Sequence, residues 1–97
     1  MRKVRTHRFN GVKFDINLIG DDECLRMGEC DSPRSGDFRP TISINVNLNT
    51  KLGVQTTLHE CLHAEGWAVS EEVVRRVADE IGDLLWRLNF RMVNSKK

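Results

Sequence analysis

Residues 41–67 read TISINVNLNTKLGVQTTLHECLHAEGW, and the period of their hydrophobic pattern changes midway. Over 41–48, apolar residues alternate with polar ones, which predicts a half-buried β-strand. Over 51–65 the apolar residues recur at helical spacing. Asn49 or Thr50 can serve as N-cap, and a glycine follows as terminator. The stretch therefore predicts a strand that leads directly into an α-helix.

The chain ahead of this stretch has the pattern of a sheet. Apolar and polar residues alternate over 12–18 (VKFDINL), and residues 4–9 match the same pattern more weakly. Asn10-Gly11 between them is the preferred dipeptide of a type I′ hairpin turn. Residues 24–30 could add a further strand. We therefore expect a small antiparallel β-meander of three or four strands.

A second helix is predicted after Ser70. This serine is a favourable N-cap, and Glu71 and Glu72 fall in the first turn, where the helix dipole favours acidic residues. Apolar residues then recur along the segment and give it a broad face to bury. The predicted elements are a sheet and two helices, over 1–48, 51–65 and 70–90. This order, sheet first and helices second, indicates a single α+β domain.

Composition argues against several classes of protein. Of the 97 residues, 39% are apolar and 30% are charged, and the net charge is +1, so no global field favours nucleic acid as the partner. No apolar run approaches the roughly 20 residues that a membrane-spanning helix needs, and the N-terminus lacks a signal-peptide core. Three cysteines without a C-x-x-C pair fit a reducing compartment. We therefore expect a cytoplasmic protein that acts away from the membrane.

The predicted first helix contains the sequence HECLH. His59 and His63 lie one turn apart, so both imidazoles can reach one ion, and Glu60 stands beside them. A catalytic zinc site has three protein ligands and a water. Two histidines on a solvated helix face would have the same spacing, but the chain has only three histidines. The core contacts of this helix are predicted to come from a different stripe: Val54, Leu58, Cys61 and Leu62.

A third ligand has to come from elsewhere in the chain. His7 is predicted to be an exposed residue of the first strand, and no histidine follows His63. On the second helix, Glu71 falls at the margin of the side that faces the first helix, whereas Glu72 falls on the far side. We therefore predict Glu71 as the third ligand, although a first-turn acid favoured by the helix dipole would look the same.

Several motifs together carry a resemblance to a known family. They are a Gly-x-Cys-Asp element (Gly28, Cys30, Asp31), the strand ISINVNL, the helix TTLHECLHAEGW and the helix start SEEVV. This combination resembles the minimal zincin-type metallopeptidases, which are gluzincin-like and often encoded by phages or other mobile elements. The resemblance implies a minimal zincin-like fold with Zn²⁺ on His59, His63 and Glu71. It also implies that Glu60 is the catalytic acid/base and that a peptide or protein substrate lies along a sheet edge.

One part of such a site is missing, which keeps a second interpretation open. Many zincins use a tyrosine or histidine to stabilise the oxyanion, and this chain has no tyrosine. His7, Arg34 and Arg39 are candidates among which the sequence does not choose. The alternative is a non-catalytic binding or regulatory protein in which zinc only stabilises the fold. A DNA-associated regulator with a basic N-terminus is a weaker third interpretation.

Overall fold

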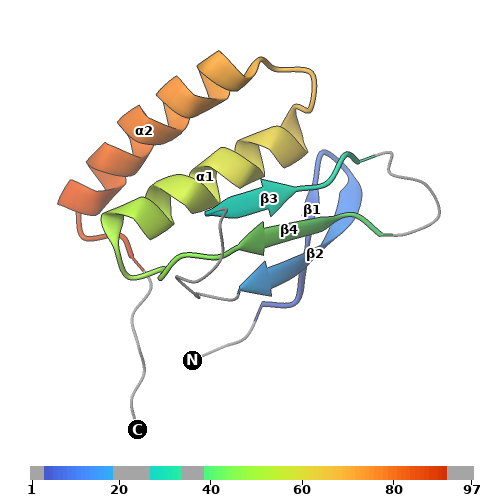
Figure 1. The fold of residues 1–97 in the computed structure, drawn as a ribbon, viewed down its shortest axis with the longest axis horizontal. Coiled ribbons are helices and arrows are strands. Elements are labelled where there is room, and N and C mark those ends of the chain that lie inside the picture. Colours follow the sequence, from blue (N-terminus) through green and yellow to red (C-terminus); the bar gives the residue numbers. More distant parts are fainter. Residues whose placement is uncertain (1–3, 19–26, 34–38, 92–97) are drawn as a thin grey trace, which may run out of the picture.

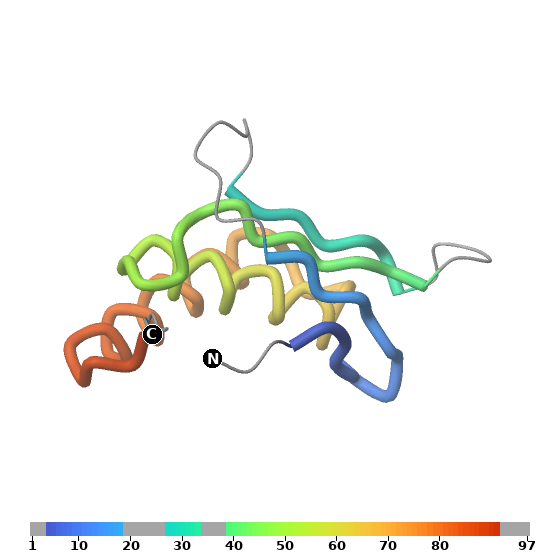
Figure 2. Tube along the Cα trace, turned by 90° about the horizontal axis from the view of Figure 1, so that it is seen from below, coloured from blue at the N-terminus to red at the C-terminus, as the bar shows by residue number. Residues whose placement is uncertain are grey.

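The computed structural model describes residues 4–18, 27–33 and 39–91. The elements are β1 (Thr6–Phe9), β2 (Val12–Leu18), β3 (Gly28–Cys30), β4 (Thr41–Ile44), α1 (Lys51–Glu65) and α2 (Glu71–Arg87). Strands precede helices along the chain, which confirms the predicted α+β class (Figure 1). The helices lie on one side of the sheet, and α1 is the nearer to the strands (Figure 2).

The sheet is mixed, whereas a purely antiparallel meander was predicted. Its strand order is β1-β2-β4-β3, in which β2 and β4 are parallel and the two outer pairs are antiparallel. Ile42 and Ile44 of β4 are each 1% exposed. A central place in the sheet allows this strand to bury its apolar side chains. The three-residue β3 is only partly buried and lies at the edge. A short, polar strand is tolerated there.

The predicted hairpin turn is present between β1 and β2. Phe9 pairs with Val12, and Asn10 and Gly11 have φ values of 51° and 81°. A type I′ turn needs positive φ at both central residues, which asparagine and glycine adopt more readily than other residues do.

The strand predicted over 41–48 ends at Ile44 because the chain turns toward α1. The Asn47 carbonyl accepts hydrogen bonds from the Thr50 backbone N–H at 3.3 Å and from its hydroxyl at 2.7 Å. The Asn47 side chain accepts another from the Asn49 N–H at 3.1 Å. Such local bonds compete with the sheet ladder and replace it here.

Both helices begin where their caps predict. The Thr50 hydroxyl accepts a hydrogen bond from the Gly53 N–H at 3.0 Å, so Thr50 rather than Asn49 caps α1. The Ser70 hydroxyl caps α2 by accepting from the Val73 N–H at 3.3 Å. At the other end, α2 stops at Arg87, a little before the predicted residue 90. The chain leaves the helix there because Asn89 adopts a φ of 70°.

The core lies between the sheet and α1. Its buried side chains are Phe9, Phe14, Ile42, Ile44 and Ala64. The residues of α1 that are most buried are Gly53, Thr56, Glu60 and Ala64, so the predicted apolar stripe is not the most buried side of the helix. Of that stripe, Cys61 packs against the core, and the other three residues are half-buried. Small residues on the sheet side let the helix approach the strands closely.

Among the described residues, no helix is both long and apolar enough to cross a membrane.

Candidate metal centre

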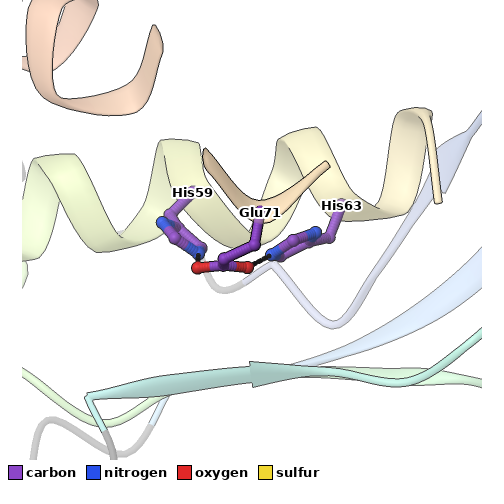
Figure 3. Close-up of side chains that lie close together, drawn as sticks. All are labelled: His59, His63 and Glu71. Carbon is purple, nitrogen blue, oxygen red and sulfur yellow. Dashed lines mark ion pairs between the residues drawn. The ribbon is translucent and has the colours of Figure 1, made fainter. Parts of the chain in front are cut away.

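Three side chains predicted as zinc ligands lie together at the junction of the helices (Figure 3). Nε2 of His59 lies 3.0 Å from Oε2 of Glu71, and Nε2 of His63 lies 2.9 Å from Oε1 of the same carboxylate. The carboxylate therefore bridges the two imidazoles. Glu72 is not part of this group.

The backbone explains this convergence. His59 and His63 stand one turn apart on α1, with ring centroids separated by 4.8 Å. The short connection 66–70 reverses the chain, so that α2 returns beside α1 (Figure 1). Because Ser70 caps α2, Glu71 is its first helical residue and lies next to the last turn of α1.

The geometry of the donor atoms suits a single metal ion. One donor atom from each residue lies within 4.8 Å of the others. Zinc bonds of about 2.0–2.1 Å in a tetrahedron place neighbouring ligand atoms about 3.3 Å apart. The two histidine–carboxylate distances of 2.9 and 3.0 Å are slightly shorter than this, so small side-chain rotations would admit an ion.

Glu60 lies beside the three residues on the sheet side of α1. It is 7% exposed, and its pKa is raised from 4.5 to about 7. Burial is the main cause, because it disfavours the charged form, and the carboxylates of Glu71 and Glu29 add repulsion. A carboxyl group that titrates near neutral pH can both accept and return a proton.

The candidate centre opens onto a groove between α1 and β3. The groove has a volume of about 800 Å³, and it is bordered by Gly28, Glu29, Cys30, Asp31, His59, Glu60, His63, Trp67 and Glu71. A second hollow of about 450 Å³ shares Gly28, His59, Glu60 and Glu71 with it and extends toward the first turn of α1. The site is thus accessible to a ligand from one side.

Trp67 borders the groove and Arg75 borders the second hollow, and neither was predicted as part of the site. A tryptophan is usually largely buried, but Trp67 is 48% exposed and its ring lies 6.0 Å from that of His63. Arg75 borders the second hollow, and its Nη2 lies 3.6 Å from Oε2 of Glu71. The spacing of four residues between Glu71 and Arg75 is the sequence signal that could have indicated this neighbour.

The candidates for oxyanion stabilisation lie elsewhere or are not described. His7 is exposed on β1, as predicted, and contacts Phe9. Arg39 forms an ion pair with Asp15 at 2.9 Å. Neither borders the groove, and Arg34 lies outside the described residues. Arg75 is the arginine that borders the second hollow.

Cys30 ends β3 and borders the groove. Its thiol donates to the Asp31 carbonyl at 3.4 Å and packs against the core. Burial raises its pKa to about 12, and the charges of Glu60 and Asp31 act in the same direction. The side chain is therefore a neutral thiol at physiological pH. Cys61 has a pKa raised to about 11, also mainly by burial.

Comparisons with protein-family models, with curated protein sequences and with solved structures give no match to this chain. The resemblance to zincins therefore depends on the motif and on the arrangement of the side chains described above.

Proposed function

We propose that this protein is a zinc-dependent metallopeptidase of the minimal zincin type that hydrolyses peptide bonds in a peptide or protein substrate. The observation that carries the proposal is the convergence of His59, His63 and Glu71 beside an open groove. Structural zinc sites are closed by four protein ligands, whereas catalytic sites have three and keep one position accessible.

Zinc is the metal that this donor set favours. Two imidazoles and one carboxylate are its usual ligands in hydrolytic sites. A bound zinc would polarise the scissile carbonyl and lower the pKa of a coordinated water to about 7.

Glu60 is proposed as the acid/base. It follows His59 directly on α1 and borders both hollows next to the three proposed ligands. From there its carboxylate can take a proton from the attacking water and return it to the leaving amine. Its role as a ligand is disfavoured, because its side chain lies on the sheet side of α1 rather than facing α2.

The edge strand β3 is a suitable support for an extended substrate. Met27 and Asp31 form backbone hydrogen bonds with residues next to and within β4. By the alternation of an antiparallel pair, the backbone groups of Gly28 and Cys30 point away from β4, to the edge that no described strand pairs with. A peptide that adds to this edge would pass along the groove that the three proposed ligands border.

Arg75 is proposed to stabilise the oxyanion in place of the missing tyrosine. Its guanidinium lies 3.6 Å from a Glu71 oxygen, so its charge is close to the position of the reacting carbonyl. Its side chain is 67% exposed, which allows it to reorient toward a bound substrate. A donor aimed at the developing charge lowers the barrier.

Metal analysis and one substitution test the proposal. Protein purified without chelator should contain about one zinc per chain. Glu60→Gln should retain the metal and lower the cleavage of a proteome-derived peptide mixture, followed by mass spectrometry, by about 100-fold or more. Protein without zinc, or cleavage that is unchanged in Glu60→Gln, would exclude this activity.

A non-catalytic, zinc-stabilised protein is the second candidate. It is favoured by the way α2 is held, since α2 packs on α1 and on no described strand. An ion shared by His63 and Glu71 would tie the two helices together. In that case His59→Ala should lower the melting temperature, while the wild-type protein and Glu60→Gln should both leave the peptide mixture intact.

A further inference from the structure

A further hollow, of about 590 Å³, lies at the C-terminal end of α1. The hairpin of β1 and β2, the chain that follows β3 and the connection between α1 and α2 meet around it (Figure 1). Its apolar walls come from these three segments and from the last turn of α1: Val12, Pro33, Ala64, Trp67 and Ala68. We call it the end hollow.

The end hollow continues the groove beside the candidate metal centre. Trp67 borders both of them. His63 and Asp31 border the groove. Ala64 and Ser32, which directly follow them in the chain, border the end hollow. An extended peptide that lies along β3 past the proposed zinc ligands therefore also passes the end hollow, into which one of its side chains can point.

The end hollow has a negative charge at its border. Oε2 of Glu65 accepts a hydrogen bond from the backbone N–H of Asn10 at 3.2 Å, and both residues border the hollow. This bond holds the last residue of α1 against the turn between β1 and β2, and it fixes the carboxylate there. The described residues that border the groove and the end hollow include no lysine or arginine that could neutralise this charge.

Apolar walls beside a carboxylate favour a long basic side chain. Lysine and arginine have an aliphatic stem that packs on apolar surface and a cationic end. The stem fits the walls of the end hollow, and the cation can pair with Glu65 and lie near the Trp67 ring, which attracts cations. An apolar side chain would contact the walls without pairing with the carboxylate, and an acidic one would be repelled.

We infer that the substrate has a lysine or an arginine close to the scissile bond and that this side chain enters the end hollow. The inference rests on the proposed peptidase activity and names the class of peptide on which it acts. Glu65 and Trp67 determine which peptide binds, whereas the proposed zinc ligands and Glu60 carry out the reaction.

Peptide titrations followed by NMR test this binding in the Glu60→Gln protein with zinc present, so that the peptides stay intact. The probes are blocked pentapeptides of alanine with a central lysine, norleucine or glutamate. Norleucine resembles the lysine stem but lacks the charge. The lysine peptide should shift the indole N–H signal of Trp67 and leave that of Trp86, on α2, in place. It should bind about fivefold or more tightly than the norleucine peptide, because it adds an ion pair and a cation–π contact. The glutamate peptide should bind most weakly.

Glu65→Gln, added to the same protein, tests the source of this preference. The amide keeps an acceptor for the Asn10 N–H and removes only the charge. This variant should bind the lysine and norleucine peptides equally. Glu80→Gln removes the same charge from an exposed position of α2 and should keep the preference for lysine. A lysine preference that survives Glu65→Gln, or equal binding of the two peptides before this substitution, would overturn the inference.

Cleavage sites in the proteome-derived peptide mixture separate this inference from the proposed function. Bonds cleaved by the wild-type protein should have lysine or arginine at one fixed position, and Glu65→Gln should lose this preference while it still cleaves. Cleavage without a basic preference would overturn the inference and leave the peptidase activity in place. A protein that binds the lysine peptide at Trp67 but cleaves nothing would exclude the peptidase activity and support the end hollow as a site for a basic side chain.

Discussion

The carboxylate of Glu71, the first residue of α2, lies 2.9 Å from Nε2 of His63 in the last turn of α1. Each helix therefore supplies part of the candidate centre, which forms only when the helices pack together. Val74 and Ala78, each 1% exposed, are two of the α2 residues that maintain this packing. Metal binding at this centre would therefore be coupled to folding, because an ion that binds only the folded state stabilises it.

Replacing Glu71 by glutamine should weaken zinc binding without disturbing the fold. The amide keeps the shape of the side chain but removes the charge of the ligand. We expect zinc affinity to fall by about 100-fold or more. Loss of a residue that only hydrogen-bonds to a metal ligand already lowers metal affinity by about 10–100-fold. Competition with a chromophoric chelator measures this affinity, and zinc should no longer raise the melting temperature of the variant.

Glu72→Gln is the matched control for this substitution. It makes the same chemical change one residue along the helix, outside the group of converging side chains. Zinc affinity should therefore stay within about threefold of wild type, because substitutions at exposed positions usually have effects no larger than this. An equal loss of zinc affinity in the two variants would show that the negative charge of the first turn of α2 attracts the metal, and that Glu71 is not a ligand.

Arg75→Gln should lower the turnover number more than it changes KM. A buried oxyanion donor contributes about 100–1000-fold, and a more exposed guanidinium should contribute at least about tenfold. Arg76→Gln is the control, because Arg76 pairs with Glu80 at 3.8 Å and does not border the groove. Steady-state kinetics on one cleaved peptide separate the two constants. A rise in KM with an unchanged turnover number would assign Arg75 to substrate binding alone.

The helices and the histidine pair were predictable because their signals are local. Thr50 and Ser70 mark helix starts through hydrogen bonds that span three residues. His59 and His63 share a face because of the helical period itself. Glu71 could be placed near them because the apolar side of the second helix indicates which of its residues face the first helix.

The sheet order and the groove depend on contacts between distant segments. Local alternation in 12–18 and 41–48 predicts strands, but it does not reveal that β2 and β4 pair in parallel. A residue as large as tryptophan is usually buried, yet Trp67 lies beside the groove because α1 ends just before it. Glu60 is buried because it lies on the side of α1 that faces the sheet. Which side faces the sheet depends on tertiary packing.

Gly28→Ala should impair hydrolysis while leaving the metal in place. A Cβ at Gly28 would lie 2.8 Å from Cγ2 of Thr56 and 3.0 Å from Cγ of Glu60. Either β3 moves away from α1 or Glu60 is displaced. A shift of about 1 Å in a reacting group can reduce the rate about 100-fold. Zinc affinity should change by less than about threefold on the same scale, because His59 and His63 lie on other faces of α1.

Measuring the zinc affinity of Gly28→Ala shows whether the substitution displaces Glu60 or unfolds the protein. If Gly28→Ala lost zinc and helix content together, the glycine would be required for folding rather than for the position of the acid/base. If cleavage were unchanged, Glu60 would tolerate the methyl group, and its position beside β3 would not matter for the rate.

Removing the ionisable group at Glu60 should stabilise the metal-free protein at neutral and higher pH. Below pH 4.5 this carboxyl is protonated in both the folded and the unfolded chain, so it has no effect on stability. Its pKa is about 7 in the folded protein. As the pH rises from 4.5 through 7, the unfolded chain loses the proton first, and the folded state becomes less favourable by up to about 3 kcal/mol.

Glu60→Gln should therefore match the wild-type melting temperature near pH 4.5 and exceed it above pH 7, with chelator present throughout. The groups that face Glu60 are the carboxylates of Glu71 and Glu29, and the thiol of Cys30 lies close by. All of them are retained in the variant, so the difference between the two melting curves isolates Glu60. Glu80→Gln, on the exposed side of α2, should show no such pH-dependent gain. A difference that is constant from pH 4.5 to 8 would mean that Glu60 titrates in the folded protein as it does in the unfolded chain.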